Sequence, residues 1–273
     1  MTLELKTNES PTVINFVHAN GFPAATYTTF LHYLSDEFTV IAHKKYGHNV
    51  NFPIHNNWQY LVDELIDYLE QKRMLTRQPA ITVGHSFGGT LAFMAACKRP
   101  DLFKGLIMLD PPVMTGMLAF LLKSVKGTRL LDNITPAGKA NNRRTRWPKQ
   151  TNMADVFSHT PLFRNFDSRC LKDYSQYAII NHEDELRLDF DAKIEADIFR
   201  HLPTHLSRLK NNLTVPAALV YGKQSNLYPH YFFKRFARQH KTISLYTTEG
   251  SHMFPLEYPE QVTSLIKTII KPW

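Results

Sequence analysis

The chain has 273 residues, of which 43% are hydrophobic and 21% are charged, so it can bury a full core and is not a disordered polar chain. Lysine and arginine number 32 against 24 aspartates and glutamates, a formal charge of +8 that could attract nucleic acid or an anionic membrane. The basic residues lie in separate short clusters with no nucleic-acid-binding motif beside them, so we interpret them as a solvated surface and expect no nucleic-acid partner.

The two cysteines, Cys97 and Cys170, are too few for a disulfide framework. The N-terminal sequence MTLELKTNESPT contains no apolar signal core. No apolar run approaches the roughly 18 residues that a membrane span needs. We therefore expect a soluble, cytoplasmic protein with no membrane span.

Short apolar runs rich in β-branched residues alternate with helical patterns along most of the chain. Their continuous apolar character is typical of strands that are buried on both faces of a parallel sheet. Strands are predicted at residues 12–17, 38–42, 80–83, 105–109, 217–221 and 242–246. Helices are predicted at residues 58–73, 90–98 and 259–270. This alternation predicts an α/β fold with a mostly parallel, doubly wound sheet.

The alternation breaks between Pro112 and Asn212. This stretch contains clustered basic residues and helical patterns such as residues 192–199, without a clear buried strand. We interpret it as an inserted, mainly helical subdomain. The core would then comprise residues 1–111 and 213–273, and the insertion residues 112–212.

The sequence Gly84-His85-Ser86-Phe87-Gly88 matches the pattern G-x-S-x-G. A predicted strand precedes it and a predicted helix follows it, which is the strand–turn–helix setting of a nucleophile elbow. In that turn the serine has a strained backbone, so the residues two positions to either side must be small. A glycine-rich turn with an N-capping serine is the alternative interpretation. The setting favours Ser86 as a nucleophile at a helix N-terminus, where developing negative charge is stabilised.

With this motif the chain resembles the α/β-hydrolase superfamily over nearly its whole length. The resemblance rests on residues 18–23 (HANGFP), 84–89 (GHSFGG), 109–112 (LDPP) and 250–254 (GSHMF). The HANGFP form, combined with an insertion, resembles a bacterial subgroup of capped serine hydrolases. The resemblance implies the α/β-hydrolase fold, with the insertion as a cap over the active site.

The superfamily order of catalytic residues is serine, then acid, then histidine. His252, in the Gly-Ser-His turn after the last predicted strand, matches the family's base. The usual acid position, in a Gly-x-x-Asp turn, holds Ser225, which supplies no negative charge. A known variant takes the acid from the strand after the nucleophile, where Asp110 stands, and we predict a triad of Ser86, His252 and Asp110. If Asp110 is only a turn residue, a Ser-His dyad remains.

The family's oxyanion hole needs two aligned backbone donors. The resemblance implies the amide of Phe87 as the first donor. Aligning the family's His-Gly-x-Pro motif with the sequence NGFP implies the amide of Phe22 as the second. In this interpretation Gly21 permits the tight turn, and Asn20 or His18 braces the loop.

The insertion contains two further groups of candidate residues. Apolar residues near its start suit either a pocket for an acyl chain or the cap's own core, and they are Met114, Met117, Leu118, Phe120, Leu121 and Leu122. The basic residues Arg143, Arg144 and Arg146 either bind a substrate carboxylate or phosphate or belong to a solvated face.

The leading interpretation is an enzyme that hydrolyses a carboxylic ester, thioester or lactone of a small apolar substrate through an acyl-enzyme on Ser86. C–C bond hydrolysis or acyl transfer on the same residues are alternatives. A non-catalytic ligand-binding scaffold is another, because the usual acid is missing. No metal-ligand spacing or dinucleotide fingerprint occurs, so we expect no cofactor.

Overall fold

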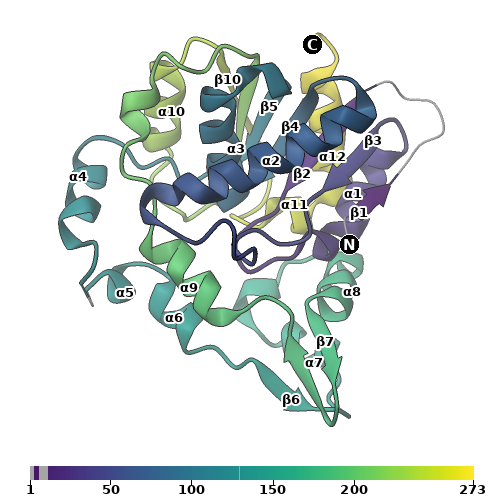
Figure 1. Ribbon diagram of the computed structural model, residues 1–273. Coiled ribbons are helices and arrows are strands. Elements are labelled where there is room, and N and C mark those ends of the chain that lie inside the picture. The colour runs from purple at the N-terminus through teal and green to yellow at the C-terminus, as the bar shows by residue number, and fades with distance from the viewer. Residues whose placement is uncertain (1–2, 6–11, 129) are drawn as a thin grey trace.

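The computed structural model describes residues 3–5, 12–128 and 130–273. A seven-stranded sheet forms its centre, with helices on both faces (Figure 1). Its strand order is β1-β3-β2-β4-β5-β9-β10, and every neighbouring pair is parallel except β1 with β3. The strands are β1 (Leu3–Leu5), β2 (Val13–Val17), β3 (Thr39–Ala42), β4 (Ala80–His85), β5 (Phe103–Leu109), β9 (Ala217–Gly222) and β10 (Ile243–Thr248).

The predicted α/β class and the mostly parallel, doubly wound sheet are confirmed. Each predicted strand is present, with ends within two residues of the predicted ones. The sequence did not indicate β1, because a three-residue antiparallel edge strand is too short to show a periodic pattern.

The sheet is buried on both faces. One face is covered by α2 (Gln59–Thr76), α3 (Phe87–Lys98) and α10 (Tyr231–Gln239), and the other by α1 (Thr28–Ser35) and α12 (Pro259–Ile270). Successive residues of β5 alternate between the two cores, with Leu106 and Met108 in the first and Ile107 and Leu109 in the second. This two-sided burial explains why the strands are apolar without interruption.

Residues 112–212 leave the sheet after β5 and return to it at β9. Their helices are α4 (Gly116–Val125), α5 (Leu130–Ile134), α6 (Ala137–Asn141), α7 (Met153–Ser158), α8 (Ser168–Tyr177) and α9 (Ala192–Arg200). Figure 1 shows α5, α6, α7, α8 and α9 on the lower side of the view and α4 at the left, and α8 packs against α1. None of the helices in the described part of the chain combines the length and apolarity needed to cross a bilayer.

This segment also contains strands that the sequence did not indicate. They are β6 (Arg146–Pro148), β7 (Ile179–His182) and β8 (Glu185–Leu188), which form a separate antiparallel sheet in the order β6-β8-β7. Only alternate residues of β8 are buried, and β7 has none, so neither strand has the continuous apolar pattern of the central sheet. The short remaining helices are η1 (Ala24–Tyr27), η2 (Asn56–Trp58), η3 (Pro100–Leu102), η4 (Pro161–Phe163), η5 (Leu206–Leu209) and α11 (Phe254–Glu257).

Two fully buried histidines tie strand ends to neighbouring loops. The Nδ1–H of His18, directly after β2, donates to the carbonyl of Ala19 at 2.8 Å, and its Nε2 accepts from the Tyr46 amide at 3.0 Å. Both ring nitrogens are thus used, and burial lowers the pKa of His18 to about 3.

His85, the last residue of β4, has the opposite tautomer. Its Nε2–H donates to the carbonyl of His252 at 2.9 Å, and its Nδ1 accepts from the hydroxyl of Tyr27 at 2.7 Å. Burial lowers the pKa of this imidazole to about 3. A neutral imidazole that forms two hydrogen bonds therefore joins β4 to the loop that follows β10.

Replacing Gly88 with alanine should destabilise the fold strongly. An ideal Cβ at this position would lie 2.1 Å from the carbonyl oxygen of Val17, so α3 and β2 would have to separate. We expect a loss of about 3 kcal/mol in the free energy of unfolding, measured by urea denaturation. Gly127→Ala is the control, because a Cβ there meets nothing within 4 Å and adds only the strain of a positive φ, about 1 kcal/mol. Equal losses in the two variants would contradict the steric explanation.

Stability should fall as the pH drops below about 6.5, in part because of the two buried histidines. Their folded pKa of about 3 lies below the unfolded value of 6.5, so between these values the unfolded state binds more protons. Each ring contributes up to about 1.4 kcal/mol per pH unit to the slope of unfolding free energy against pH. His85→Gln should remove one such contribution from the slope of unfolding free energy against pH. An unaltered slope in His85→Gln would overturn the prediction.

Candidate active site

Ser86 occupies a strained turn between β4 and α3. Its backbone has φ 53° and ψ −120°, a conformation that L-residues rarely adopt. A Cβ on Gly84 would lie 2.3 Å from the carbonyl oxygen of Gly88, so the turn has no room for a side chain there. Gly84 and Gly88 must therefore be small, because their backbone atoms are in direct contact. Ser86 is partly exposed.

His252 lies in the loop after β10, between the serine and a carboxylate. Its Nε2 is 3.0 Å from Ser86 Oγ, and its Nδ1 is 2.6 Å from Asp110 Oδ2. Because an ionised carboxylate only accepts, Nδ1 carries the proton and Nε2 is left to accept from the serine hydroxyl. The three side chains thus form one hydrogen-bonded line from three different segments of the chain.

Asp110 directly follows β5 and has no exposed surface. Its φ is 46°, and its amide donates to the carbonyl of Val220 at 2.8 Å, which holds it against β9. The Oδ2 atom that meets His252 also accepts from the Ser225 hydroxyl at 2.6 Å. Oδ1 accepts a longer hydrogen bond, 3.4 Å, from the Gly222 amide. Ser225 occupies the position at which the family usually carries its acid. Here it donates a hydrogen bond to Asp110, which follows the neighbouring strand β5.

Backbone contacts hold the histidine loop against the turn after β9. A Cβ on Gly222 would lie 2.4 Å from the carbonyl oxygen of Gly250, and the Gln224 amide donates to that same oxygen at 3.0 Å. The Gln224 side chain in turn accepts from the Gly250 amide at 2.6 Å. On the other side, the Ser251 amide donates to the carboxylate of Glu257 at 2.7 Å. These contacts fix the backbone of the loop that carries His252.

The loop after β2 forms a tight turn. The Phe22 amide donates to the carbonyl of Ala19 at 3.1 Å, and Gly21 has φ 80°, as the third position of a type II turn requires. The Phe22 amide, expected from the sequence as the second oxyanion donor, is therefore engaged within the turn. The amides of Asn20 and Gly21 have no acceptor among the described residues. The first turn of α3 packs directly against the start of this loop, at the carbonyl oxygens of Val17 and His18.

Phe87 is the first residue of α3 and carries the other expected donor. Helix N-termini leave their first amides without intrahelical acceptors, and within the described chain the Phe87 amide has none. Its buried ring packs edge-on against Trp58, with centroids 4.9 Å apart. The amide therefore has a fixed position beside Ser86.

The arginines of the insertion separate into two kinds. Arg144 and Arg146 are exposed, the first over the ring of Trp147 and the second 3.3 Å from the carboxylate of Glu185. Arg143 turns inward and forms an ion pair with Glu195 of α9 at 2.5 Å. Glu195 was not a sequence candidate. No local pattern links it to the site, because its backbone oxygen accepts from Asn20, 175 positions earlier.

The apolar stretch at the start of the insertion also divides. Met114 and Leu122 are buried and Leu118 packs against the core. The remaining three side chains are exposed on the outer side of α4: Met117 at 70%, Phe120 at 65% and Leu121 at 55%. Only part of the stretch therefore belongs to the interior of the protein.

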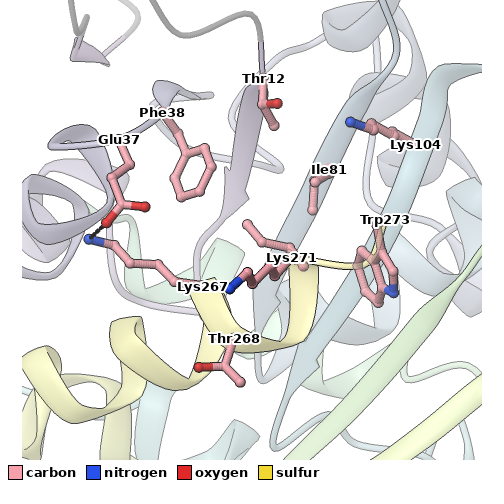
Figure 2. A pocket seen from close by; sticks show the side chains of 10 residues that line it. Thr12, Glu37, Phe38, Ile81, Lys104, Lys267, Thr268, Lys271 and Trp273 are labelled. Atoms are coloured by element: carbon pink, nitrogen blue, oxygen red, sulfur yellow. Dashed lines mark ion pairs between the residues drawn. The ribbon is translucent and has the colours of Figure 1, made fainter.

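A hollow of about 510 Å³ lies away from these residues (Figure 2). It is lined by residues at the amino ends of β2, β4 and β5, including Thr12, Ile81 and Lys104, and by the end of α12. Ser86 and Asp110 follow the carboxyl ends of β4 and β5. The hollow is therefore at the opposite edge of the sheet and is no part of the candidate site.

Comparisons with known proteins agree with this architecture. Residues 16–265 match the family model described as "Alpha/beta hydrolase family". A solved structure of E-2-(acetamidomethylene)succinate hydrolase superposes with a TM-score of 0.78 at 20% identity, covering 98% of this chain and 94% of that one. At this identity the likeness shows the fold.

Two curated relatives are named hydrolases or lipases. 2-(Acetamidomethylene)succinate hydrolase of Mesorhizobium japonicum is 31% identical over 137 residues, so the match spans about half of either protein, 49% of each. Monoglyceride lipase of Mus musculus is 22% identical over 278 residues, covering 97% of this chain and 83% of the lipase. With the family model matched over most of its length, the chain belongs to the alpha/beta hydrolase family and is a hydrolase.

Proposed function

We propose that this hydrolase cleaves a carboxylic ester, thioester or lactone of a small apolar substrate through an acyl-enzyme on Ser86. The observation that carries the proposal is the hydrogen-bonded line from Ser86 Oγ through His252 to Asp110, with steps of 3.0 and 2.6 Å. Nucleophile and base lie within hydrogen-bond reach, and a third group orients the base. The buried carboxylate of Asp110 in that third position supports it as the acid in place of the absent Gly-x-x-Asp acid.

In the first half of the reaction, Ser86 Oγ attacks the carbonyl carbon of the substrate and its proton passes to His252 Nε2. The imidazolium is stabilised by Asp110, whose charge is held next to Nδ1. The bond to the leaving alcohol or thiol then breaks, and His252 returns the proton to the leaving group. A water molecule repeats these steps on the acyl-enzyme and releases the acid and free Ser86.

The negative oxygen formed in each half-reaction needs two preorganised donors. We assign the Phe87 amide as the first. In place of Phe22 we assign the amide of Asn20 as the second, because it has no acceptor among the described residues and belongs to the loop against which the first turn of α3 packs. Neither donor needs to break a protein hydrogen bond before it binds the oxyanion.

We also assign residues 112–212 as a cap. Its helix α9 contacts the Asn20 loop through Glu195, and the Trp58 indole donates to the Ile198 carbonyl of the same helix at 2.9 Å. Aromatic side chains flank this region, with the ring of Phe22 4.8 Å from that of Tyr174. Such surroundings favour an uncharged apolar acyl group.

Ser86→Ala should abolish hydrolysis and leave the fold intact, because only the nucleophilic oxygen is lost. The measurement is turnover of p-nitrophenyl esters of increasing acyl length, together with covalent labelling by a fluorophosphonate probe. Wild-type protein should be labelled at Ser86 and the variant should not. Retention of most esterase activity by the pure variant would refute the mechanism, and absence of labelling in a folded wild type would favour a non-catalytic scaffold.

Asp110→Asn should lower kcat by roughly 10²–10⁴, because the amide keeps the shape but loses the charge that stabilises the imidazolium. Ser225→Ala removes only one donor to the same carboxylate, so its loss should be much smaller. The measurement is kcat on the best ester found for the wild type.

A double variant provides the matched control. Ser225→Asp in the Asp110→Asn background restores a carboxylate within the same hydrogen-bonded group, and partial recovery of kcat is expected. The reverse ranking, with Ser225→Ala severe and Asp110→Asn mild, would show that the acid is misassigned. Equal mildness would indicate a Ser-His dyad.

A further inference from the structure

A partly buried ion pair of the insertion lies directly on the loop that presents Asn20. Arg143 Nη1 and Glu195 Oε2 are 2.5 Å apart, and their side chains are 25% and 11% exposed. An ideal Cβ on Gly21 would lie 2.7 Å from Glu195 Oε1, so the carboxylate rests against the backbone of that residue. The Asn20 side chain donates to the Glu195 backbone carbonyl at 2.9 Å. Helix α9 therefore contacts both residues at the centre of the turn.

The carboxylate of Glu195 brings a negative charge close to the amide assigned as an oxyanion donor. Left alone, that charge would oppose the negative oxygen of the tetrahedral intermediate, and partial burial would weaken its screening by solvent. Burial raises the pKa of Glu195, whereas Arg143 acts in the opposite direction and favours the ionised form. The 2.5 Å contact pairs the Glu195 carboxylate with the Arg143 guanidinium, so the two opposite charges balance within the pair.

Arg143 contacts two side chains, those of Glu195 and Tyr174. Its Nη1 donates to Glu195, and its Nη2 lies 3.4 Å from the hydroxyl of Tyr174, whose ring packs on Phe22 at the end of the same turn. Arg143 is therefore joined to the turn through two separate side chains. Its exposed neighbour Arg144 makes neither contact.

We propose that Arg143 is a positioning residue of the insertion that clamps the Asn20–Gly21 turn through Glu195 and neutralises the Glu195 charge beside the oxyanion hole. This inference rests on the proposed function, since it assigns a role toward the Asn20 donor. The geometry of that donor then depends on the insertion as well as on the core.

The test compares Arg143→Ala with the double variant Arg143→Ala/Glu195→Gln on the uncharged substrate p-nitrophenyl butyrate. Arg143→Ala leaves an unpaired carboxylate beside the oxyanion hole, so kcat should fall by roughly 10- to 100-fold while KM changes by less than about threefold. Glu195→Gln removes the charge and leaves in place the backbone carbonyl that accepts from Asn20, so the double variant should recover most of the lost kcat. Arg144→Ala is the matched control and should behave as wild type.

Three outcomes would overturn the inference. In the first, Arg143→Ala has the same kcat as Arg144→Ala. In the second, the loss of kcat in Arg143→Ala persists fully in the double variant. A loss confined to KM and to an anionic ester, such as a p-nitrophenyl succinate monoester, would instead make Arg143 a substrate-binding residue. If Arg143→Ala does not fold, Arg143→Gln removes the charge with a smaller change in volume and is read in the same way.

An activity-independent measurement separates failure of this inference from failure of the proposed function. Amide hydrogen exchange of the peptide that contains the Asn20–Gly21 turn should be faster in Arg143→Ala than in wild type and Arg144→Ala. If wild-type hydrolysis does not depend on Ser86, the proposed function fails, and the exchange rates still decide whether the clamp exists. Unchanged exchange in a folded Arg143→Ala would refute the clamp even in an active enzyme.

Discussion

The buried carboxylate of Asp110 is the constraint on which the geometry of the site depends. A charge with no exposed surface must be balanced by donors inside the protein, or its burial would cost several kcal/mol. Those donors are the Gly222 amide, the Ser225 hydroxyl and the imidazole of His252. They come from the end of β9, the turn after it and the loop after β10, so balancing one charge sets the positions of these segments relative to β5.

The order of the sheet explains how an acid from β5 reaches a histidine that follows β10. β5 pairs in parallel with β9, and β9 with β10, so the carboxyl ends of the strands meet at one edge. Asp110 stands one residue beyond the pairing of Leu109 with Val220, and Ser225 lies in the turn that follows the same partner strand. A second carboxylate at position 225 would repel the first across this short distance, whereas a hydroxyl donates to it. The serine therefore complements an acid placed on β5.

Helix α9 links the insertion to the elements that carry both free amides. Through Ile198 it holds Trp58, which packs on Phe87, and through Glu195 it holds the turn of Asn20. Hydrogen bonds connect α9 to Trp58 and to Asn20, and Trp58 packs on Phe87. One helix is therefore connected to two segments that are far apart in sequence. A rearrangement of the insertion would therefore act on the amides of Asn20 and Phe87, which lie outside it.

The sequence by itself determined the six parallel strands of the central sheet and the position of the elbow, because strand and helix periodicity and the glycines around Ser86 are local patterns. It placed His252 in the last loop through its resemblance to a family. Only the tertiary structure decided which of these residues contact one another. Asp110 and Ser225 meet from 115 positions apart, the Phe22 amide is used within its own turn, and Arg143 turns inward while Arg144 faces solvent. These outcomes depend on burial and on hydrogen bonds between distant segments, which no local pattern of residues encodes.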